Sequence, residues 1–390
     1  MSILLNEQQV DATYKADEWW NNSNEQVFEI SGAAGTGKTF LVRYLIERFE
    51  LDLDEVLFVA YMGKAAMALA RNGLPAKTIH SAIYNYQKVL DKVDGKIQLT
   101  PSGKPKTKFI FTLKEKIPKN IRLIVVDEAG MVNEQIAKDL KSFGVPIIAL
   151  GDLNQLPPVF GKSGFLNDPD VILTQIMRQA EGNPIIYLSQ QVLKDEPLKI
   201  GVYKNSSVIS SDDLDEYKFK NADIVLTGTN RLRYNINNMF REHIYKGLKL
   251  DRPNVGEKII CRKNNWNRQV LENIFLTNGM SGIVEYVDAQ SFNGKQLKID
   301  FKPDFLNRSF KNVTIDYERL FSSPSTEINA YNYNRDIFEF AYAITVHLSQ
   351  GSQYPNVLFL KEDIGLSKED RKKHAYTAIT RASESITIAI

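Results

Sequence analysis

Eight residues near the start of the chain, from Gly32 to Thr39, have the types and spacing of a phosphate-binding loop. They read Gly-Ala-Ala-Gly-Thr-Gly-Lys-Thr, which matches G-x-x-x-x-G-K-T, and they follow an apolar run at residues 27–30. Glycines let backbone N–H groups surround nucleotide phosphates, and the N-terminus of the following helix favours their charge. Lys38 would reach the terminal phosphates, and the Thr39 hydroxyl would bind Mg²⁺. A chance match in a glycine-rich turn is the alternative, and the strand–loop–helix context disfavours it.

Acidic and amide side chains follow two further apolar runs, at residues 121–126 and 147–150. Asp127 could hold Mg²⁺, and Glu128 could orient or activate the attacking water. An acidic turn is common after a strand, but a phosphate-binding loop on the same sheet favours the catalytic interpretation. Gln155 could contact the terminal phosphate or the water. A structural loop stiffened by Pro157 and Pro158 explains that segment equally well.

The elements that would position these residues belong to an α/β fold. Buried-type runs at residues 27–30, 56–60, 123–126 and 147–150 alternate with helical patterns such as 38–49. This alternation predicts a parallel sheet covered on both faces. A second α/β half begins near residue 168, with strands expected at 223–226, 340–343, 356–360 and 385–390. Residues 87–118, with a turn at Asp94-Gly95, and residues 251–334 have short β-prone runs and are expected to be β insertions.

Composition sets the class of protein. A chain of 390 residues predicts two to four domains, and 43% hydrophobic with 25% charged residues is typical of a globular protein. A net charge of +2 does not by itself indicate a nucleic-acid partner. The single cysteine, Cys261, cannot form an internal disulfide, which favours a reducing, cytoplasmic setting. The first residues lack a signal peptide's basic region, and no apolar run has the length of a membrane span.

Seven blocks, in order, resemble the motifs of superfamily 1 helicases, most closely the RecD-like and Dda-like branch. They are the phosphate-binding loop, Thr78-Ile79-His80, Asp127-Glu128-Ala129-Gly130-Met131, Gly151-Asp152-x-x-Gln155-Leu156-Pro157-Pro158, Thr174 to Gln179, Ala341 to Ser352 and Tyr376 to Ala382. The resemblance covers nearly the whole chain except the two β insertions. It implies two RecA-like domains that bind ATP and Mg²⁺ in the cleft between them.

The resemblance also implies roles for single residues around the nucleotide. Residues 5–9 are similar to the family's N-terminal glutamine motif, so Gln9 would contact adenine. Arg178 and Arg381 would reach the γ-phosphate from the second domain, because arginines stabilise the charge that develops there during phosphoryl transfer. A lone arginine is more often part of a surface salt bridge. The implied ATP-binding set is Gln9, Gly32, Ala33, Ala34, Gly35, Thr36, Gly37, Lys38, Thr39, Gly351 and Gln353.

A motor that moves along a single strand would hold its phosphates by hydrogen bonds and its bases by stacking. A lone histidine is usually structural, and only the motif position favours binding at His80 and His347. The contacts implied by the resemblance are Lys64, Thr78 and His80 on the first domain, and Thr229, Asn230, Asn237, Thr345, His347 and Ser349 on the second.

The first insertion carries lysines around Phe109 and Phe111, a composition that suits backbone contact and base stacking. A solvated hairpin with its own small core explains it about equally well. The resemblance implies a pin that splits the duplex or braces the strand, and we assign Phe111 to that role. The lysines are Lys104, Lys106, Lys108, Lys114, Lys116 and Lys119.

Four motifs depart from the family pattern. Tyr61-Met62 stands where the family usually has Pro-Thr, which puts one phosphate contact in doubt, and Gly130 replaces a usual serine. Leu348 replaces a common lysine, and Gln353 replaces a glutamate that often contacts ribose. These departures leave the residues expected to perform hydrolysis intact.

The sequence therefore predicts a monomeric ATP-dependent DNA helicase that moves on single-stranded DNA and unwinds duplex, in a bacterial or phage-infected cell during replication or repair. The 5′-to-3′ direction follows from the resemblance only. A translocase that remodels protein–DNA complexes, a nucleotide-switched binding module and an RNA substrate are the alternatives. The expected domains are 1–86 with 119–167 (first RecA-like domain, 1A), 87–118 (insertion 1B), 168–250 with 335–390 (second RecA-like domain, 2A) and 251–334 (an SH3-like insertion, 2B).

Overall fold

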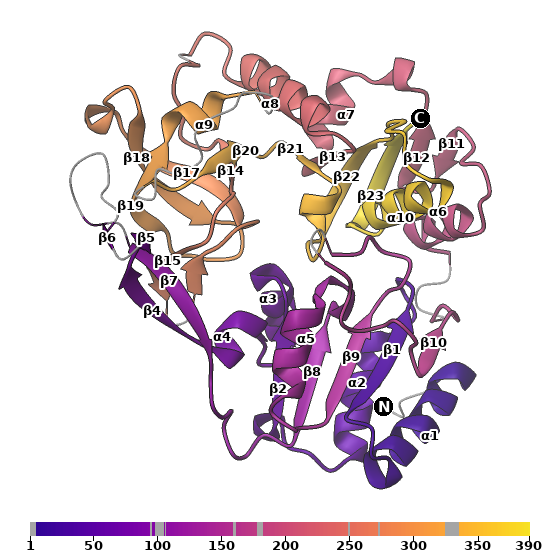
Figure 1. Cartoon of the computed structure of the whole chain (residues 1–390). Coiled ribbons are helices and arrows are strands. Elements are labelled where there is room, and N and C mark those ends of the chain that lie inside the picture. The colour runs from indigo at the N-terminus through magenta and orange to yellow at the C-terminus, as the bar shows by residue number, and fades with distance from the viewer. Residues whose placement is uncertain are drawn as a thin grey trace. The chain divides into compact units, whose positions relative to one another are not determined.

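The computed structural model describes residues 5–93, 96–97, 105, 107–158, 161–177, 182–248, 250–271, 274–323 and 335–390 (Figure 1). The chain forms two compact units. Unit 1 comprises Met1–Ile83, Leu113–Ala222 and Ser349–Ile390, and unit 2 comprises Tyr84–Thr112 and Asp223–Leu348. Arg178, one of the two predicted arginines, lies outside the described residues.

Unit 1 contains a six-stranded sheet with the order β10-β1-β9-β8-β2-β3, in which every neighbouring pair is parallel. The strands are β1 (Val27–Gly32), β2 (Val56–Ala60), β3 (Lys77–Thr78), β8 (Leu123–Asp127), β9 (Ile147–Gly151) and β10 (Val171–Leu173). The four strands predicted for the first half of the chain are therefore confirmed within two residues. Because the strands are parallel, the segments that follow β1, β8 and β9 leave the sheet at the same edge.

Both faces of this sheet are covered. Phe28, Phe58 and Val125 join one buried cluster with residues of the helices α1 (Glu7–Asn22) and α2 (Lys38–Arg48). The strand residues between them, such as Val59 and Ile124, point to the opposite face and are also fully buried. The helix α5 (Glu134–Lys141) lies in front of the sheet in Figure 1. Because both faces of the sheet are buried, its strands are apolar at consecutive positions and not only at alternate ones.

The rest of unit 1 adds short helices and part of a second sheet. Here β12 (Ser206–Ile209) pairs with β11 (Gly201–Tyr203) in antiparallel and with β23 (Ala382–Ala389) in parallel, and β23 also pairs in parallel with β22 (Tyr354–Leu360). The two predicted C-terminal strands are confirmed by β22 and β23. The helices are α3 (Gly63–Arg71), α4 (Ile79–Ile83), α6 (Pro184–Leu193), α7 (Glu216–Asn221) and α10 (Lys368–Ile379).

Unit 2 contains a parallel pair and an antiparallel sheet. The pair is β13 (Ile224–Thr227) with β21 (Ala343–Thr345), followed along the chain from β13 by the helix α8 (Asn230–Ile244). The antiparallel sheet has the order β19-β18-β17-β14-β20, and its strands are β14 (Lys258–Cys261), β17 (Ser281–Asp288), β18 (Gln296–Pro303), β19 (Phe310–Asp316) and β20 (Phe338–Phe340). The helix α9 (Tyr317–Phe321) and the pair β15 (Asn265–Leu271) and β16 (Ile274–Leu276) complete this β-rich part.

The strand predicted at residues 340–343 is wrong as a single element. Phe340 ends β20, which pairs with β14, whereas Ala343 begins β21, which pairs with β13. The run 338–346 is apolar at most positions and lies in two different sheets, so hydrophobic pattern could not locate the break.

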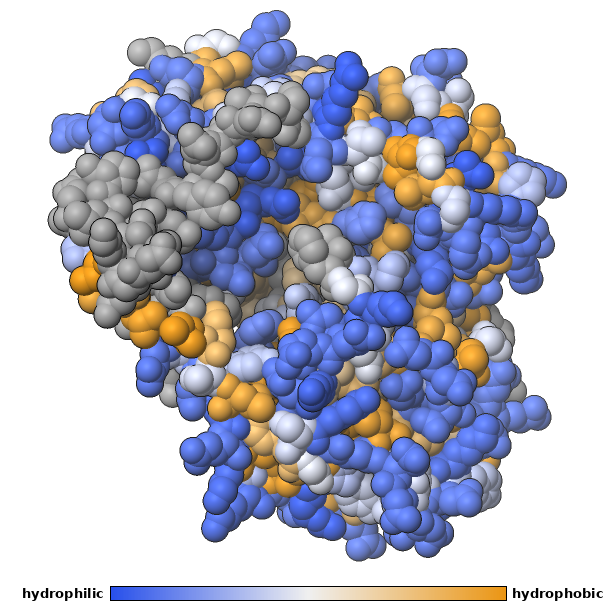
Figure 2. Space-filling view, in the orientation of Figure 1, coloured by the Kyte–Doolittle hydropathy of each residue, from blue (hydrophilic) through white to orange (hydrophobic). Residues whose placement is uncertain are grey.

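The first insertion is a β-hairpin, as predicted. The strands β4 (Tyr84–Leu90) and β7 (Thr107–Leu113) form a two-stranded sheet, and β5 (Lys92–Val93) pairs with β6 (Lys96–Ile97). The ring of Tyr86 on β4 contacts Phe275 on β16 edge-on, with ring centroids 5.5 Å apart. Apolar surface is visible over β4 and β7 in Figure 2.

Candidate functional site

The loop at residues 32–39 is tightly wound. Gly35 and Gly37 have φ values of 81° and 79°, a region that favours glycine. Thr36 is fully buried, and its hydroxyl donates to the carbonyl oxygen of Ala33 at 2.8 Å. A Cβ atom on Gly32 would lie 2.6 Å from the Thr36 Oγ1 atom, so the first loop position requires glycine. The sequence pattern and the backbone geometry therefore agree on a phosphate-binding loop.

The helix α2 begins at Lys38, directly after this loop, and no side chain caps its first N–H groups. Uncapped N–H groups and the helix dipole together favour an anion at this end. The Lys38 ammonium group donates to the carbonyl oxygens of Gly32 and Ala33, at 2.5 and 3.3 Å. Thr39 is the second residue of α2 and is half-buried. Lysine and hydroxyl thus lie at the helix end where phosphates would be held.

Asp127 and Glu128 lie at the end of β8, on the same sheet as β1. Burial and the neighbouring Glu128 carboxylate raise the pKa of Asp127 to about 7, and the charge of Lys38 opposes that rise. Glu128 has a φ of 51°, which is rare for a residue other than glycine. Strained backbone of this kind persists where surrounding structure holds it, and it is frequent at functional sites. Asp127 therefore lies near the loop lysine and beside Glu128, an arrangement that suits metal-assisted phosphoryl transfer.

The loop at residues 152–156 is held by the C-terminal part of unit 1. The Arg381 Nη2 atom donates to the Gln155 Oε1 atom at 3.0 Å, across 226 residues of sequence. Arg381 is 3% exposed, and its other nitrogens donate to the carbonyl oxygens of Thr377 and Ser352. Two residues predicted independently for catalysis, the glutamine and one arginine, are thus in direct contact.

The contacts of Tyr376 with two of these loops were not predicted from the sequence. The Tyr376 hydroxyl accepts a hydrogen bond from the Ala34 N–H at 2.8 Å and donates to the Asp152 Oδ2 atom at 2.6 Å. Tyr376 stands in a motif block, but its sequence environment carries no signal for this bond, because all three residues are far apart in the chain.

Gln9 packs against the phosphate-binding loop. It is fully buried, donates to the Thr36 carbonyl oxygen at 3.0 Å and closes the N-terminal capping box of α1 with Asn6. Beside it, Gln8 accepts from the N–H groups of Thr174 and Gln175, both at 2.8 Å. The contact of Gln9 with adenine stays a prediction, and its hydrogen bonds connect it to the loop backbone.

Met177 was also missed by sequence reasoning. Its N–H donates to the Gly35 carbonyl oxygen at 3.0 Å, and a Cβ atom on Gly37 would lie 2.3 Å from its sulfur. The residue just before the predicted Arg178 therefore lies against the phosphate-binding loop.

Gly351 and Gln353 are two further residues of the predicted ATP-binding set. Gly351 has a φ of 68° and lies close to Met62, and Gln353 is exposed.

Four predicted strand contacts belong to unit 1. Thr78 accepts from the Ser81 N–H at 3.2 Å and so begins α4. His80 lies edge-on to Tyr61, with ring centroids 6.1 Å apart, and burial lowers its pKa, which favours a neutral imidazole at neutral pH. Ser349 is fully buried. Lys64 is the second residue of α3.

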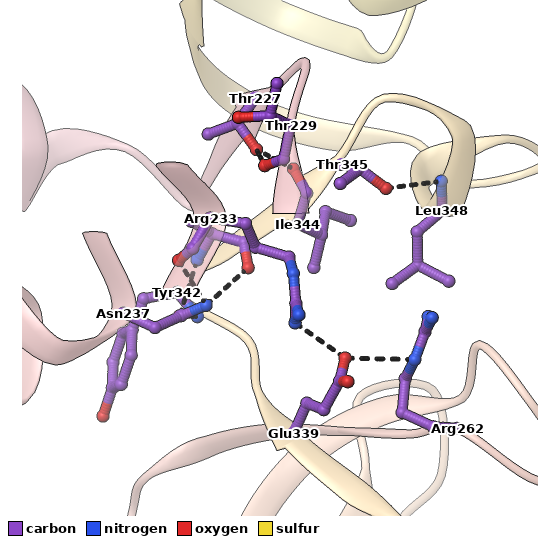
Figure 3. A network of polar contacts seen from close by, with 11 residues as sticks. Thr227, Thr229, Arg233, Asn237, Arg262, Glu339, Tyr342, Ile344, Thr345 and Leu348 are labelled. Carbon is purple, nitrogen blue, oxygen red and sulfur yellow. Dashed lines mark hydrogen bonds and ion pairs between the residues drawn. The ribbon is translucent and has the colours of Figure 1, made fainter. Parts of the chain in front are cut away.

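In unit 2 the predicted contacts Thr229 and Thr345 follow or end neighbouring strands. The register pairs Thr227 with Thr345, both of which are labelled in Figure 3. The Thr229 hydroxyl accepts from the Leu232 N–H as the N-cap of α8. Asn230 and His347 are exposed. These polar residues gather at the carboxyl ends of two parallel strands, the edge at which α/β proteins bind ligands.

Asn237 has a different role from the one predicted. It is 3% exposed, donates to the carbonyl oxygens of Arg233 and Ala343, and accepts from the N–H groups of Tyr342 and Ala343 (Figure 3). These four bonds use both amide protons and both oxygen lone pairs, so no capacity remains for a phosphate. We therefore remove Asn237 from the strand-binding set: it holds the chain between β20 and β21 onto α8.

Phe111 lies on β7 of the insertion hairpin and is 36% exposed. Its ring meets that of Tyr84 edge-on at 6.3 Å. Of the lysines predicted around it, Lys114 donates to the carbonyl oxygens of Ser81 and Ala82, so it braces the hairpin base. Lys104 and Lys106 lie outside the described residues.

No helix among the described residues is long and apolar enough to cross a membrane.

Comparison with known proteins agrees with the nucleotide-binding and helicase motifs found in the sequence. A family model described as "AAA domain" matches residues 4–213, and one described as "UvrD-like helicase C-terminal domain" matches residues 340–389. The chain is 26% identical over 91% of its length to the ATP-dependent RecD2 DNA helicase of Deinococcus radiodurans, and it spans 46% of that protein. It is 26% identical over 93% of its length to the ATP-dependent DNA helicase Pif1 of Campylobacter jejuni, of which it spans 88%.

Among solved structures, a Pif1 helicase from Bacteroides in complex with ADP-AlF3 and ssDNA has a TM-score of 0.53 at 18% identity, covering 100% of this chain and 93% of that one. That likeness supports the fold of two RecA-like domains. With the first family model covering more than half of the sequence, and with the motifs in contact as described, the chain belongs to the AAA domain family, as a superfamily 1 helicase of the RecD-like and Pif1-like kind.

Proposed function

We propose that this protein is a monomeric, ATP-dependent DNA helicase that moves 5′ to 3′ on single-stranded DNA and unwinds duplex. The observation that carries this proposal is the contact between Gln155 and Arg381 within a unit that also contains the phosphate-binding loop and the acidic pair. Hydrolysis would then depend on an arginine of the C-terminal segment Ser349–Ile390. The direction of movement rests on the resemblance only. The cytoplasmic location rests on the single cysteine, and the domain boundaries rest on the strand pattern together with the resemblance.

ATP with Mg²⁺ fits the residues present. The N–H groups at the start of α2 and Lys38 would hold the β- and γ-phosphates, and Thr39 and Asp127 would hold the metal. Magnesium would neutralise charge on the transferred phosphoryl group. Glu128 would accept the proton of the attacking water, and Gln155 with Arg381 would bind the developing negative charge.

DNA as the partner is supported by the relatives, since RecD2 and Pif1 are named as DNA helicases. In this chain the grip on the strand would come from Thr78 and His80 in unit 1 and from Thr229, Thr345 and His347 in unit 2. Most of these are neutral hydrogen-bonding groups, which suits a grip that must release at every step. With a net charge of +2, affinity should depend on salt less steeply than for a strongly basic protein.

The test of this function is the ATPase rate with and without single-stranded DNA. We expect strong stimulation in the wild type. Because Lys38→Ala removes the cation that holds the terminal phosphates, it should lower the stimulated rate by about 100-fold. A wild-type rate indifferent to both DNA and RNA would exclude the motor, and stimulation by RNA alone would exclude DNA as the substrate.

The hairpin gives a separate expectation for Phe111. Phe111→Ala should lower the duplex unwinding rate by about 5-fold while the DNA-stimulated ATPase rate changes less than about 2-fold. The reason is that only strand separation would need a base to stack on the Phe111 ring. Unwinding of a forked duplex and ATP turnover would be measured side by side. Ile110→Ala, on the neighbouring residue of β7, is the matched control. Equal loss of both activities, or loss of neither, would contradict the assignment.

The pKa of Asp127 gives a pH dependence. A carboxyl whose pKa is raised to about 7 is mostly protonated below that pH, and Mg²⁺ binds the carboxylate. Affinity for Mg²⁺–nucleotide should therefore rise by about 10-fold between pH 6 and pH 8, with release of a proton on binding. Calorimetry in two buffers of different ionisation enthalpy would measure that proton. Asp127→Asn should bind weakly and lose this part of the pH dependence; a variant with the same pH profile as wild type would assign it to other groups.

A further inference from the structure

The hydroxyl group of Tyr376 lies between two loops that the proposed reaction needs. Tyr376 comes from α10 and is fully buried. Its hydroxyl accepts from the Ala34 N–H of the phosphate-binding loop and donates to the Asp152 carboxylate of the 152–156 loop, at 2.8 and 2.6 Å. One oxygen atom thus connects the loop expected to hold phosphate with the loop that carries Gln155.

The same C-terminal segment attaches to the 152–156 loop at three further points. The Leu156 N–H donates to the Thr377 hydroxyl at 3.0 Å, and the Leu156 carbonyl oxygen accepts from the Gln350 side chain at 2.7 Å. The third is the bond between Arg381 and Gln155. These contacts fix the far end of the loop, whereas Tyr376 fixes its start at Asp152 and also bonds the phosphate-binding loop.

The protonation of the Tyr376 hydroxyl decides which group donates each of these two hydrogen bonds. Asp152 is 6% exposed, and its Oδ1 atom already accepts from the N–H and the side chain of Asn154. Burial and the Asp152 carboxylate raise the pKa of Tyr376 far above its usual range, so the hydroxyl stays protonated. It must then donate to the carboxylate, and its lone pair is left for the Ala34 N–H. Phenylalanine would fill the same volume and leave both buried partners short of one bond.

We propose that Tyr376 is a positioning residue for ATP hydrolysis, which sets the phosphate-binding loop relative to the loop that carries Gln155 and its partner Arg381. This inference rests on the proposed function and adds a residue to it. Tyr376 would act on the transition state, since Gln155 and Arg381 would contact the γ-phosphate most strongly as charge develops there. Binding of ADP, which has no γ-phosphate, would not need the alignment.

The variant Tyr376→Phe tests this. We expect kcat for DNA-stimulated ATP hydrolysis to fall by about 10-fold with KM for ATP within about 2-fold of wild type, because the lost bonds matter mainly in the transition state. Affinity for ADP with aluminium fluoride, which stands in for the transferred phosphoryl group, should fall by about 10-fold, and affinity for ADP alone should not change. The matched control is Tyr203→Phe on β11, which removes a hydroxyl that donates to the Lys199 carbonyl oxygen.

Thermal melting would establish that each variant is folded. If Tyr376→Phe does not fold, Asp152→Asn supplies the second test, because it keeps an acceptor and removes the charge; it should lower affinity for ADP with aluminium fluoride but not for ADP. Equal losses for the two ligands, or no loss for either, would overturn the proposal. The two affinities are measured without DNA, so a failure of the motor hypothesis itself would be seen separately, as a wild-type ATPase rate that DNA does not change.

Discussion

Arg381→Ala is expected to lower kcat for ATP hydrolysis by about 1000-fold at saturating single-stranded DNA. Arginines that stabilise the transferred phosphoryl group contribute about 10³ to 10⁵ in kcat. Here the guanidinium is held by the carbonyl oxygens of Thr377 and Ser352, which leaves Nη2 to meet Gln155. Such a fixed donor costs little reorganisation when negative charge develops beside it. KM for ATP should change much less than kcat.

Arg381→Lys separates charge from geometry. Lysine keeps the charge but lacks the planar fork that reaches three partners at once, so most of the loss should remain. Arg371→Ala is the control, because Arg371 lies on α10, the helix that precedes Arg381, and is half exposed, 3.8 Å from Asp363. Binding of a fluorescent ADP analogue and thermal melting would show that the Arg381 variants are folded. A kcat within about 3-fold of wild type would remove Arg381 from the catalytic machinery.

Glu128→Gln should lower kcat by a similar factor, about 1000-fold, while nucleotide affinity is kept. A positioned general base contributes about 10² to 10⁴. Glutamine has the same shape and can still orient water, but it cannot accept the proton. Loss of the Glu128 charge should also lower the pKa of Asp127, because that carboxylate is one cause of its rise. Affinity for Mg²⁺–ADP at pH 6 should therefore increase slightly in the variant.

Single-turnover hydrolysis, with bound ATP chased by unlabelled ATP, measures the chemical step without product release. Glu134→Gln is the matched control, since Glu134 is an exposed glutamate in the first turn of α5, shortly after Glu128 in the chain. If Glu128→Gln hydrolysed bound ATP at the wild-type rate, another group would have to act as the base, and Asp127 would be the next candidate by position.

Arg381 and Glu128 could be selected from the sequence by residue type and motif position, but the sequence could not give their arrangement in space. The strands β1, β2, β8 and β9 were predicted within two residues because each is a short apolar run whose hydrophobicity does not depend on its neighbours. The phosphate-binding loop was predicted because its geometry is local, with glycine required at positions of positive φ such as Gly35 and Gly37. The departures at Tyr61 and Gly130 were also visible in sequence.

Other residues depended on partners that no local pattern reveals. The run at 338–346 is apolar at most positions, so its division between β20 and β21 was decided by the strands that pair with each half. Asn237 looked like a strand contact from its place in the chain, and its burial against Tyr342 and Ala343 showed a structural role. Gln9 was expected to face a base, and its side chain bonds the Thr36 carbonyl oxygen.

By itself, then, the sequence determined the fold class and the nucleotide loop and gave candidates for the reactive groups, because these depend on residue type and on spacing over a few positions. Tertiary structure decided which of those groups meet: Arg381 with Gln155, and Tyr376 with Ala34 and Asp152, across 226, 342 and 224 residues. A hydrogen bond requires atoms within about 3 Å, and only the packing of distant elements sets separations of that size.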